Sequence, residues 1–259
     1  LAPGFVGIVG AAQVAAFEEC RSLRLRVGAL PQNPTGLMGY AFNWSPEGVV
    51  NEYLNDCEVI EEGVRKNVSS MEWIETVYVN GVMLEAFTTS GGLGTICETF
   101  HGKVDNIDYK SMRYPGHMRL MNFFFHELLM RERRELAGEI LTNAKPPVND
   151  DVVYIHVSAE GMLAGRLQRR EFVRAYRPIE LAGAQRTAIA WTTSASAVAV
   201  IGNPAAFPLL LGRAASILHA NDRPGRNRVF RFHGYREERL APDAWELSGR
   251  PRRLPDLAG

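Results

Sequence analysis

The sequence has little that would tie it to nucleic acid, a membrane or a metal. Its 29 basic residues are balanced by 29 acidic ones, so the net charge gives no reason to expect nucleic acid or an anionic membrane as a partner. No apolar run approaches the length of about 20 residues that a membrane-spanning helix needs, and no signal peptide is visible. The three cysteines, Cys20, Cys57 and Cys97, are far apart and odd in number, which fits neither a CxxC metal site nor a disulfide framework. We therefore expect a protein of a reducing cytoplasm that binds no metal.

Signatures of common hydrolases are missing as well. The sequence contains neither HExxH nor GxSxG. The Ser, His and Asp residues show no spacing that is typical of nucleophilic catalysis. Chemistry based on a catalytic zinc ion or an activated serine is therefore not indicated.

What the sequence does contain is alternation of apolar and polar residues. Residues 22–31 alternate cleanly, and two alternating runs flank Asn80-Gly81, a pair that favours the type I′ turn of a hairpin. A further antiparallel pair is expected over residues 152–176, and residues 39–44 read as another strand. Helices are expected over residues 5–20 and 117–131, and a further one up to about 143. We predict an α+β fold, a mixed, mostly antiparallel sheet with helices on one face.

Residues 88–99, TTSGGLGTICET, form a glycine-rich turn between an expected strand and an expected helix. A dinucleotide fingerprint needs a third glycine where this sequence has Cys97, and the preceding strand sits in a hairpin rather than a βαβ unit. The loop therefore does not predict a nucleotide site. Thr89 and Ser90, with the free amides of a helix N-terminus, could instead meet an anion such as a substrate carboxylate. Alternatively, Ser90 or Thr95 caps the helix while the glycines allow a tight turn.

Three other groups of residues are candidates for an anion site. Arg113, Tyr114 and His117 lie around an expected strand-to-helix corner, where Arg113 could clamp a carboxylate and His117 could be an acid, a base or a helix cap. Trp44 lies beside Ser45, a good N-cap, so it is either an aromatic wall for a ligand or a core residue. Arg24 and Arg26 point to one side of their strand, as a second anion site or as a solvated face.

Five motifs, taken in order, resemble the saccharopine dehydrogenase family, which includes lysine 6-dehydrogenases. They are LAPGF at 1–5, GALP at 28–31, YAFNWSPEGVVNEY at 40–53, EAFTTSGGLGTICET at 85–99 and DYKSMRYPGH at 108–117. The resemblance covers roughly residues 1–200. It implies a substrate domain related in shape to the sheet domain of glyceraldehyde-phosphate dehydrogenase-like enzymes, which also forms a homodimer.

The resemblance also implies a chemistry, hydride transfer between NAD or NADP and a C–N bond of saccharopine, lysine or a related amino acid. A Rossmann domain upstream of Leu1 would bind most of the cofactor, so this chain, as a fragment, is expected to be inactive alone. The cofactor-cleft residues would be Leu1, Ala2, Pro3 and Gly4. The substrate-lining residues would be Arg24, Asn43, Trp44, Ser45, Thr89, Ser90, Arg113, Tyr114 and His117. The proton-transfer residue of the family is not placed by the motifs.

Two departures from the family leave an alternative open. After Ile201, Pro204 cuts the expected helix, and residues 202–259 are rich in Arg, Pro and Gly without a single Lys. We expect domain 1–201 to be followed by a weakly ordered tail, whose composition a shifted reading frame would also produce. The cofactor fingerprint is the other missing part. A non-catalytic module for amino-acid binding or oligomerisation is therefore the alternative to an oxidoreductase.

Overall fold

The computed structural model describes residues 1–181 and 183–201. The chain separates into two units, Leu1–Ser196 and Ala197–Gly259. The tail predicted for residues 202–259 lies outside the described residues. Within the described residues, no helix is long and apolar enough to cross a membrane.

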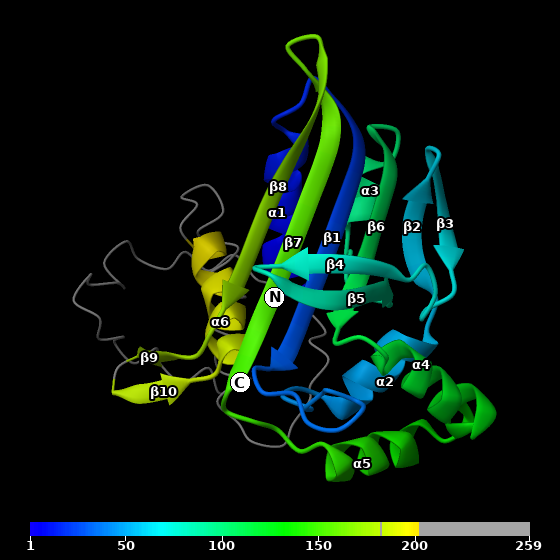
Figure 1. The fold of residues 1–259 in the computed structure, drawn as a ribbon. Helices are drawn as coiled ribbons and strands as arrows, with labels where there is room; N and C mark the ends of the chain where they lie inside the picture. The colour runs from blue at the N-terminus through cyan, green and yellow to red at the C-terminus, as the bar shows by residue number, and fades with distance from the viewer. Residues whose placement is uncertain (182, 202–259) are drawn as a thin grey trace, which may run out of the picture. The chain divides into compact units, whose positions relative to one another are not determined.

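The first unit is built on an eight-stranded sheet (Figure 1). Its main path runs β3-β2-β6-β1-β7-β8, while β5 pairs with β6 and with β4. The pairing of β1 with β6 is parallel and the other pairs are antiparallel, which confirms the predicted mixed, mostly antiparallel sheet. The strands are β1 (Glu19–Pro31), β2 (Cys57–Glu61), β3 (Val64–Val68), β4 (Glu75–Val79), β5 (Val82–Thr88), β6 (Val104–Arg113), β7 (Asp151–Leu163) and β8 (Arg166–Tyr176). A separate two-stranded ribbon joins β9 (Ile179–Leu181) to β10 (Ala184–Arg186).

Helices complete the α+β architecture in two places. The first group packs on one face of the sheet, where alternate residues of β1 and β7 form an apolar core with α1 (Gly4–Val14), α3 (Ile96–Phe100) and the start of α6 (Ala188–Ile201). The second group, α2 (Pro46–Leu54), α4 (His117–Asn122) and α5 (Arg134–Ala144), gathers at one end of the sheet around a second core (Figure 1). This second core surrounds the candidate site.

The predicted hairpin around Asn80-Gly81 is confirmed. Asn80 and Gly81 both have left-handed backbones, with φ of 49° and 81°, as a type I′ turn requires. The hairpin β4–β5 crosses over the sheet face that lies opposite α1 (Figure 1). An ion pair between Glu75 of β4 and the buried Arg26 of β1 joins the hairpin to that face.

Three predicted elements differ in the structure. Residues 39–44 form no strand, because the Phe42 amide donates to the Lys145 carbonyl of a loop instead of to a neighbouring strand. The first helix ends at Val14 rather than near residue 20, since β1 already begins at Glu19. The helix expected over 117–131 breaks into α4, a π-helical turn at Phe123–Glu127 and a 3-10 turn at Met130–Glu132. The left-handed Leu129, with φ of 55°, interrupts the helical hydrogen bonding there.

Candidate functional site

The candidate site is centred on Arg113, the last residue of β6, whose side chain is only 3% exposed. Its guanidinium lies between two aromatic rings, with Cζ 4.8 Å from the centroid of Tyr40 and 5.5 Å from that of Tyr53. Nε donates to the Tyr53 hydroxyl at 2.6 Å and Nη1 donates to the Met112 carbonyl at 2.9 Å. Burial works against the charge, but Tyr53, Tyr40 and Glu52 raise the pKa of Arg113 above its ordinary value, so it is a fixed cation.

His117, the first residue of α4, extends this network as a neutral imidazole. Its Nδ1 lies 2.9 Å from the Met38 carbonyl, which can only accept, so Nδ1 carries the proton. Nε2 then accepts a hydrogen bond from the Tyr53 hydroxyl, at 2.9 Å. Burial, and after it the charge of Arg113, lower the pKa of His117 to about 3. The result is a directed chain of hydrogen bonds from Arg113 through Tyr53 and His117 to a backbone carbonyl.

Glu52, in the last turn of α2, is the titratable group at the edge of the network. One carboxylate oxygen lies 3.8 Å from Nη2 of Arg113, and the side chain is 23% exposed. Burial raises the pKa of Glu52 to about 7, although Arg113 opposes the shift. A carboxyl group with this pKa exchanges protons near neutrality, which suits general acid–base work.

The glycine loop connects this cluster to the start of the chain. Ser90 binds the end of α2, its amide donating to the Glu52 carbonyl at 3.0 Å and its hydroxyl to the Asn51 carbonyl at 3.1 Å. A Cβ at Gly92 would overlap the Tyr109 ring, and a Cβ at Gly94 would lie 2.9 Å from Cβ of Pro3. The glycines therefore allow close packing on protein groups, and they place the predicted cofactor-cleft residue Pro3 beside the loop.

The predicted capping role of this loop is not found. The N-cap of the five-residue helix α3 is Thr95, whose side chain makes no capping hydrogen bond. The hydroxyl of Thr89 is 2.8 Å from that of Ser111 on β6, and both side chains are buried. The loop is thus anchored to β6 at Thr89 and to α2 at Ser90.

Several predicted site residues hold the surrounding backbone. The Ser45 hydroxyl accepts from the Gly48 amide at 3.0 Å and caps α2, as predicted. The amide group of Asn43 makes two hydrogen bonds with the backbone of Val148, at 2.9 and 2.8 Å. The Trp44 indole donates to the Tyr40 hydroxyl at 3.4 Å, so Trp44 is hydrogen-bonded to one of the two rings that flank the Arg113 guanidinium. Tyr114 donates its hydroxyl to the Pro31 carbonyl at 2.9 Å.

Leu1 and Pro3 also have backbone roles, as acceptors in the first turn of α1. The Leu1 carbonyl accepts from the Val6 amide at 3.3 Å, and that of Pro3 accepts from the Gly7 amide at 3.0 Å. The side chains of Leu1 and Ala2 pack against the core under α1, whereas Pro3 and Gly4 are exposed beside the glycine loop.

Arg24 is not brought to the cluster around Arg113. Arg24 pairs in register with Asp108 of β6, so side-chain alternation places it on the opposite sheet face from Arg113. It is exposed there, and its neighbour Arg26 is buried and paired with Glu75 and Asp108. The predicted anion site at Arg24 and Arg26 therefore has only Arg24 unneutralised by a carboxylate among the described residues.

Three members of the site were missed by the sequence reasoning, Tyr40, Glu52 and Tyr53. All three lie in the motif at 40–53, from which only Asn43, Trp44 and Ser45 were predicted to line the substrate site. The apolar spacing of Val49, Val50 and Tyr53 marks the buried side of α2, and a fully buried tyrosine needs a partner for its hydroxyl. The need of the Tyr53 hydroxyl for a buried partner was the one signal in the sequence that could have placed Tyr53 in the site. In residues 1–181 and 183–201 no group of His, Cys, Asp and Glu side chains could hold a metal ion.

Two comparisons relate this chain to known proteins. The structure is similar to that of apo histidine-tagged saccharopine dehydrogenase (L-Glu forming) from Saccharomyces cerevisiae, with 13% sequence identity and a TM-score of 0.49. The similarity covers 84% of this chain and 68% of the yeast chain. The family described as Saccharopine dehydrogenase C-terminal domain matches residues 1–203. This chain therefore belongs to the saccharopine dehydrogenase family and carries its C-terminal domain.

Proposed function

We propose that this chain is the substrate domain of an NAD(P)-dependent oxidoreductase that acts on the C–N bond of an amino acid. The observation that supports it best is the cluster of Glu52, Ser90 and Arg113 in a domain of the saccharopine dehydrogenase family. The substrate is saccharopine, lysine or a related zwitterion. Arg113 is a fixed cation near a substrate carboxylate, and Glu52 is a proton carrier near a substrate nitrogen.

Glu52 supplies the proton transfer that such a reaction needs. An ammonium group must lose a proton before its carbon can release a hydride, and the carboxylate of Glu52 takes that proton. When bound, NAD or NADP would supply the hydride acceptor for the oxidation of this C–N bond to an imine. Arg113 holds Glu52 from one side, since the Arg113 guanidinium is itself fixed by Tyr40 and Tyr53.

The described residues suit one end of the cofactor and not its phosphates. Gly92 packs on Tyr109 and Gly94 packs on Pro3, so neither glycine is open to a pyrophosphate. The exposed Pro3 and Gly4 are proposed to line the nicotinamide end of the cleft with Leu1 and Ala2. A dinucleotide-binding domain elsewhere in the protein would hold the rest of the cofactor.

The test is a substrate screen of the protein together with its cofactor domain. Reduction of NAD or NADP is followed by the absorbance of the reduced nicotinamide, with lysine, saccharopine and other amino acids supplied in turn. Reduction that depends on one of these amino acids is expected. Binding of both amino acid and dinucleotide without any reduction would instead establish the non-catalytic binding module.

We also propose a homodimer in a reducing, cytoplasmic compartment. The three cysteines are free and buried, as in proteins kept reduced.

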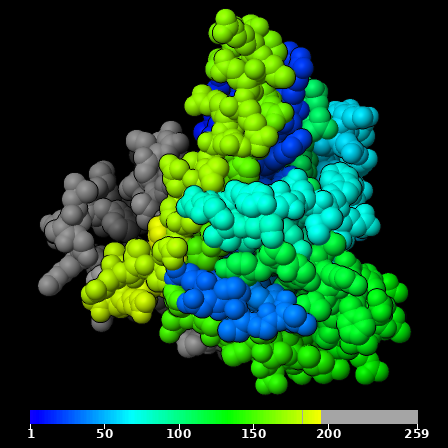
Figure 2. Space-filling view, in the orientation of Figure 1, coloured from blue at the N-terminus to red at the C-terminus, as the bar shows by residue number. Residues whose placement is uncertain are grey.

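The β4–β5 hairpin crosses the middle of the surface in Figure 2, and Tyr78 and Met83 on it are 64% and 47% exposed. Tyr78→Glu should shift a dimer to a monomer in light scattering, while the distant Leu167→Glu, also an exposed apolar residue, should not. A monomeric parent protein would contradict the proposal.

A further inference from the structure

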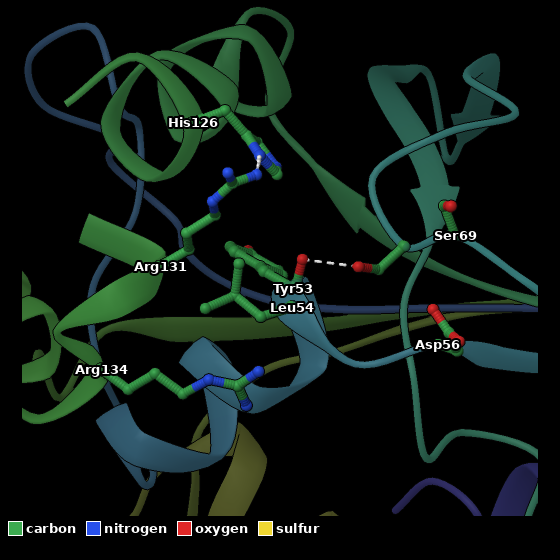
Figure 3. Close-up of a pocket in the computed structure, with 8 residues that line it drawn as sticks. Tyr53, Leu54, Asp56, Ser69, His126, Arg131 and Arg134 are labelled. Carbon is green, nitrogen blue, oxygen red and sulfur yellow. Dashed lines mark hydrogen bonds between the residues drawn. The ribbon is translucent and has the colours of Figure 1, made fainter. Parts of the chain in front are cut away.

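A pocket of about 280 Å³ lies between the end of α2 and the segment that connects α4 to α5 (Figure 3). Glu52, Ser90 and Arg113 do not line it, and Tyr53 is the residue that it shares with the cluster described above. It is lined by Tyr53, Leu54, Asp56, Ser69, Ser70, His126, Arg131 and Arg134. Pockets for drug-sized ligands have volumes of about 300–1,000 Å³, so this one suits a smaller molecule.

The cationic side of the pocket carries two arginines that pair with no carboxylate of the described residues. Arg134 donates from Nη1 to the side-chain oxygens of Asn51 at 2.7 Å and Asn55 at 2.8 Å, which are neutral amides. Arg131 donates from Nη1 to Nδ1 of His126 at 3.3 Å. No ion pair within the described part of the chain involves Arg131 or Arg134. Both guanidiniums are exposed, and within the described part of the chain they are oriented by two amide oxygens and an imidazole nitrogen rather than by a carboxylate.

The opposite side of the pocket carries the complementary charge. Figure 3 shows Asp56 and Ser69 across the pocket from His126, Arg131 and Arg134. Asp56 forms no ion pair with the residues that the structure describes. A bare anion would meet the Asp56 carboxylate, and a bare amine would meet two guanidiniums. A molecule that carries both charges satisfies both sides.

We propose that this pocket binds a free α-amino acid. Its carboxylate would be held by Arg131 and Arg134, since a guanidinium can bind a carboxylate through two parallel hydrogen bonds. Its ammonium would face Asp56, and Ser69 would supply a hydroxyl. Because the site needs neither dinucleotide nor hydride transfer, it goes beyond the proposed oxidoreductase activity.

The pocket and the Arg113 network share Tyr53. The hydroxyl of Ser70, which lines the pocket, donates to the Tyr53 carbonyl at 2.6 Å, while the Tyr53 hydroxyl binds Arg113 and His117. An amino acid in the pocket therefore contacts the residue that positions Arg113. This places the second site where it can influence the first.

The test is a calorimetric titration of the full 259-residue chain, without dinucleotide, by an amino acid and by two analogues that each lack one of its charged groups. L-Norvaline carries both charges, pentanoate lacks the ammonium, and butylamine lacks the carboxylate. Norvaline is expected to bind at least tenfold more tightly than either analogue. Pentanoate binding as tightly as norvaline would overturn the assignment, as would the absence of norvaline binding.

Variants locate the binding. Arg131→Gln should weaken norvaline binding at least tenfold, and Asp56→Asn should weaken it while improving pentanoate relative to norvaline. Arg133→Gln is the matched control, because Arg133 is an exposed neighbour that does not line the pocket. Circular dichroism checks that each variant is folded, and Asp56→Asn decides the matter should Arg131→Gln unfold. Norvaline affinity unchanged in the folded variants would overturn the proposal and leave the oxidoreductase proposal standing.

Discussion

Replacing His117 by glutamine should remove a defined part of the acid sensitivity of this domain. His117 is 1% exposed, with Nδ1 donating to the Met38 carbonyl and Nε2 accepting from Tyr53. Burial and the charge of Arg113 lower its pKa to about 3 in the folded protein. In the unfolded chain the pKa returns to about 6.5. Between these values the unfolded state binds a proton that the folded state refuses, so this group makes stability fall as the pH falls.

The size of the effect follows from the two pKa values. Between pH 7 and pH 5, a group with an unfolded pKa of about 6.5 costs the folded state about 2 kcal/mol. The figure holds for any folded pKa well below 5, because the folded imidazole then stays neutral throughout. It is a substantial part of the 5–15 kcal/mol that is typical of the stability of a whole domain.

Glu52 acts in the opposite direction over the same range. Its pKa is raised by burial to about 7 in the folded protein, above the ordinary value of 4.5. The folded state therefore binds the proton first, and stability rises by about 2 kcal/mol as the pH falls from 7 to 5. The two groups nearly cancel in the parent protein, so its own pH profile conceals both. A comparison of two proteins that both keep Glu52 isolates His117.

The assay is urea unfolding of the parent protein and of His117→Gln at pH 7 and at pH 5, followed by circular dichroism. The parent is expected to be the more stable at pH 7, and its advantage should shrink by about 2 kcal/mol at pH 5. His101→Gln is the control for replacing a histidine, because His101 is exposed and lies outside the Arg113 network. An advantage that is equal at both pH values would show that His117 titrates normally in the folded protein, and would refute the reasoning.

Two further predictions concern packing and the hairpin. Gly92→Ala should lower the free energy of unfolding by about 1–3 kcal/mol, since its Cβ would overlap the Tyr109 ring. Gly4→Ala, with nothing within 4 Å of its Cβ, should not, and equal effects would contradict the packing account. Burial raises the pKa of Glu75, but the charge of Arg26 outweighs burial and the pKa is lowered overall. The ionised Glu75 carboxylate therefore stabilises the folded protein above the ordinary pKa of 4.5, and this stabilisation is lost as the pH falls below 4.5. Glu75→Gln should therefore be less stable than the parent at pH 6, with a gap that narrows toward pH 3 in urea unfolding; a constant gap would argue against the ion pair.

Local chemistry made part of the fold predictable. The hairpin follows from Asn80-Gly81, because few other residue pairs tolerate two consecutive left-handed backbones. The cap of α2 follows from Ser45 and Pro46 for similar reasons. The backbone partners of segments far apart in the sequence could not be predicted from local chemistry. The extended reading of residues 39–44 was wrong because their backbone partner is a loop a hundred residues away.

For the candidate site, the sequence indicated the position of some residues along the chain but not their arrangement in space. The motif RYPGH indicated Arg113 and His117 correctly as neighbours at a strand-to-helix corner. That Tyr53 joins them depends on how α2 docks on β6, which no spacing in the sequence reveals. The register of β1 against β6 places Arg24 on the sheet face opposite Arg113. This register depends on how distant parts of the chain pair, so the sequence pattern of β1 alone does not reveal it.

Glu52 is proposed above as the proton acceptor of an amino-acid oxidoreductase. The most direct measurement is the pH profile of kcat/KM for the protein with its cofactor domain, compared with Glu52→Gln and with the exposed Glu47→Gln on the same helix. The parent and Glu47→Gln should lose activity below an apparent pKa near 7, while Glu52→Gln should be slower by about 10²–10⁴-fold and lack that limb. A Glu52→Gln enzyme with the rate and pH profile of the parent would contradict the claim.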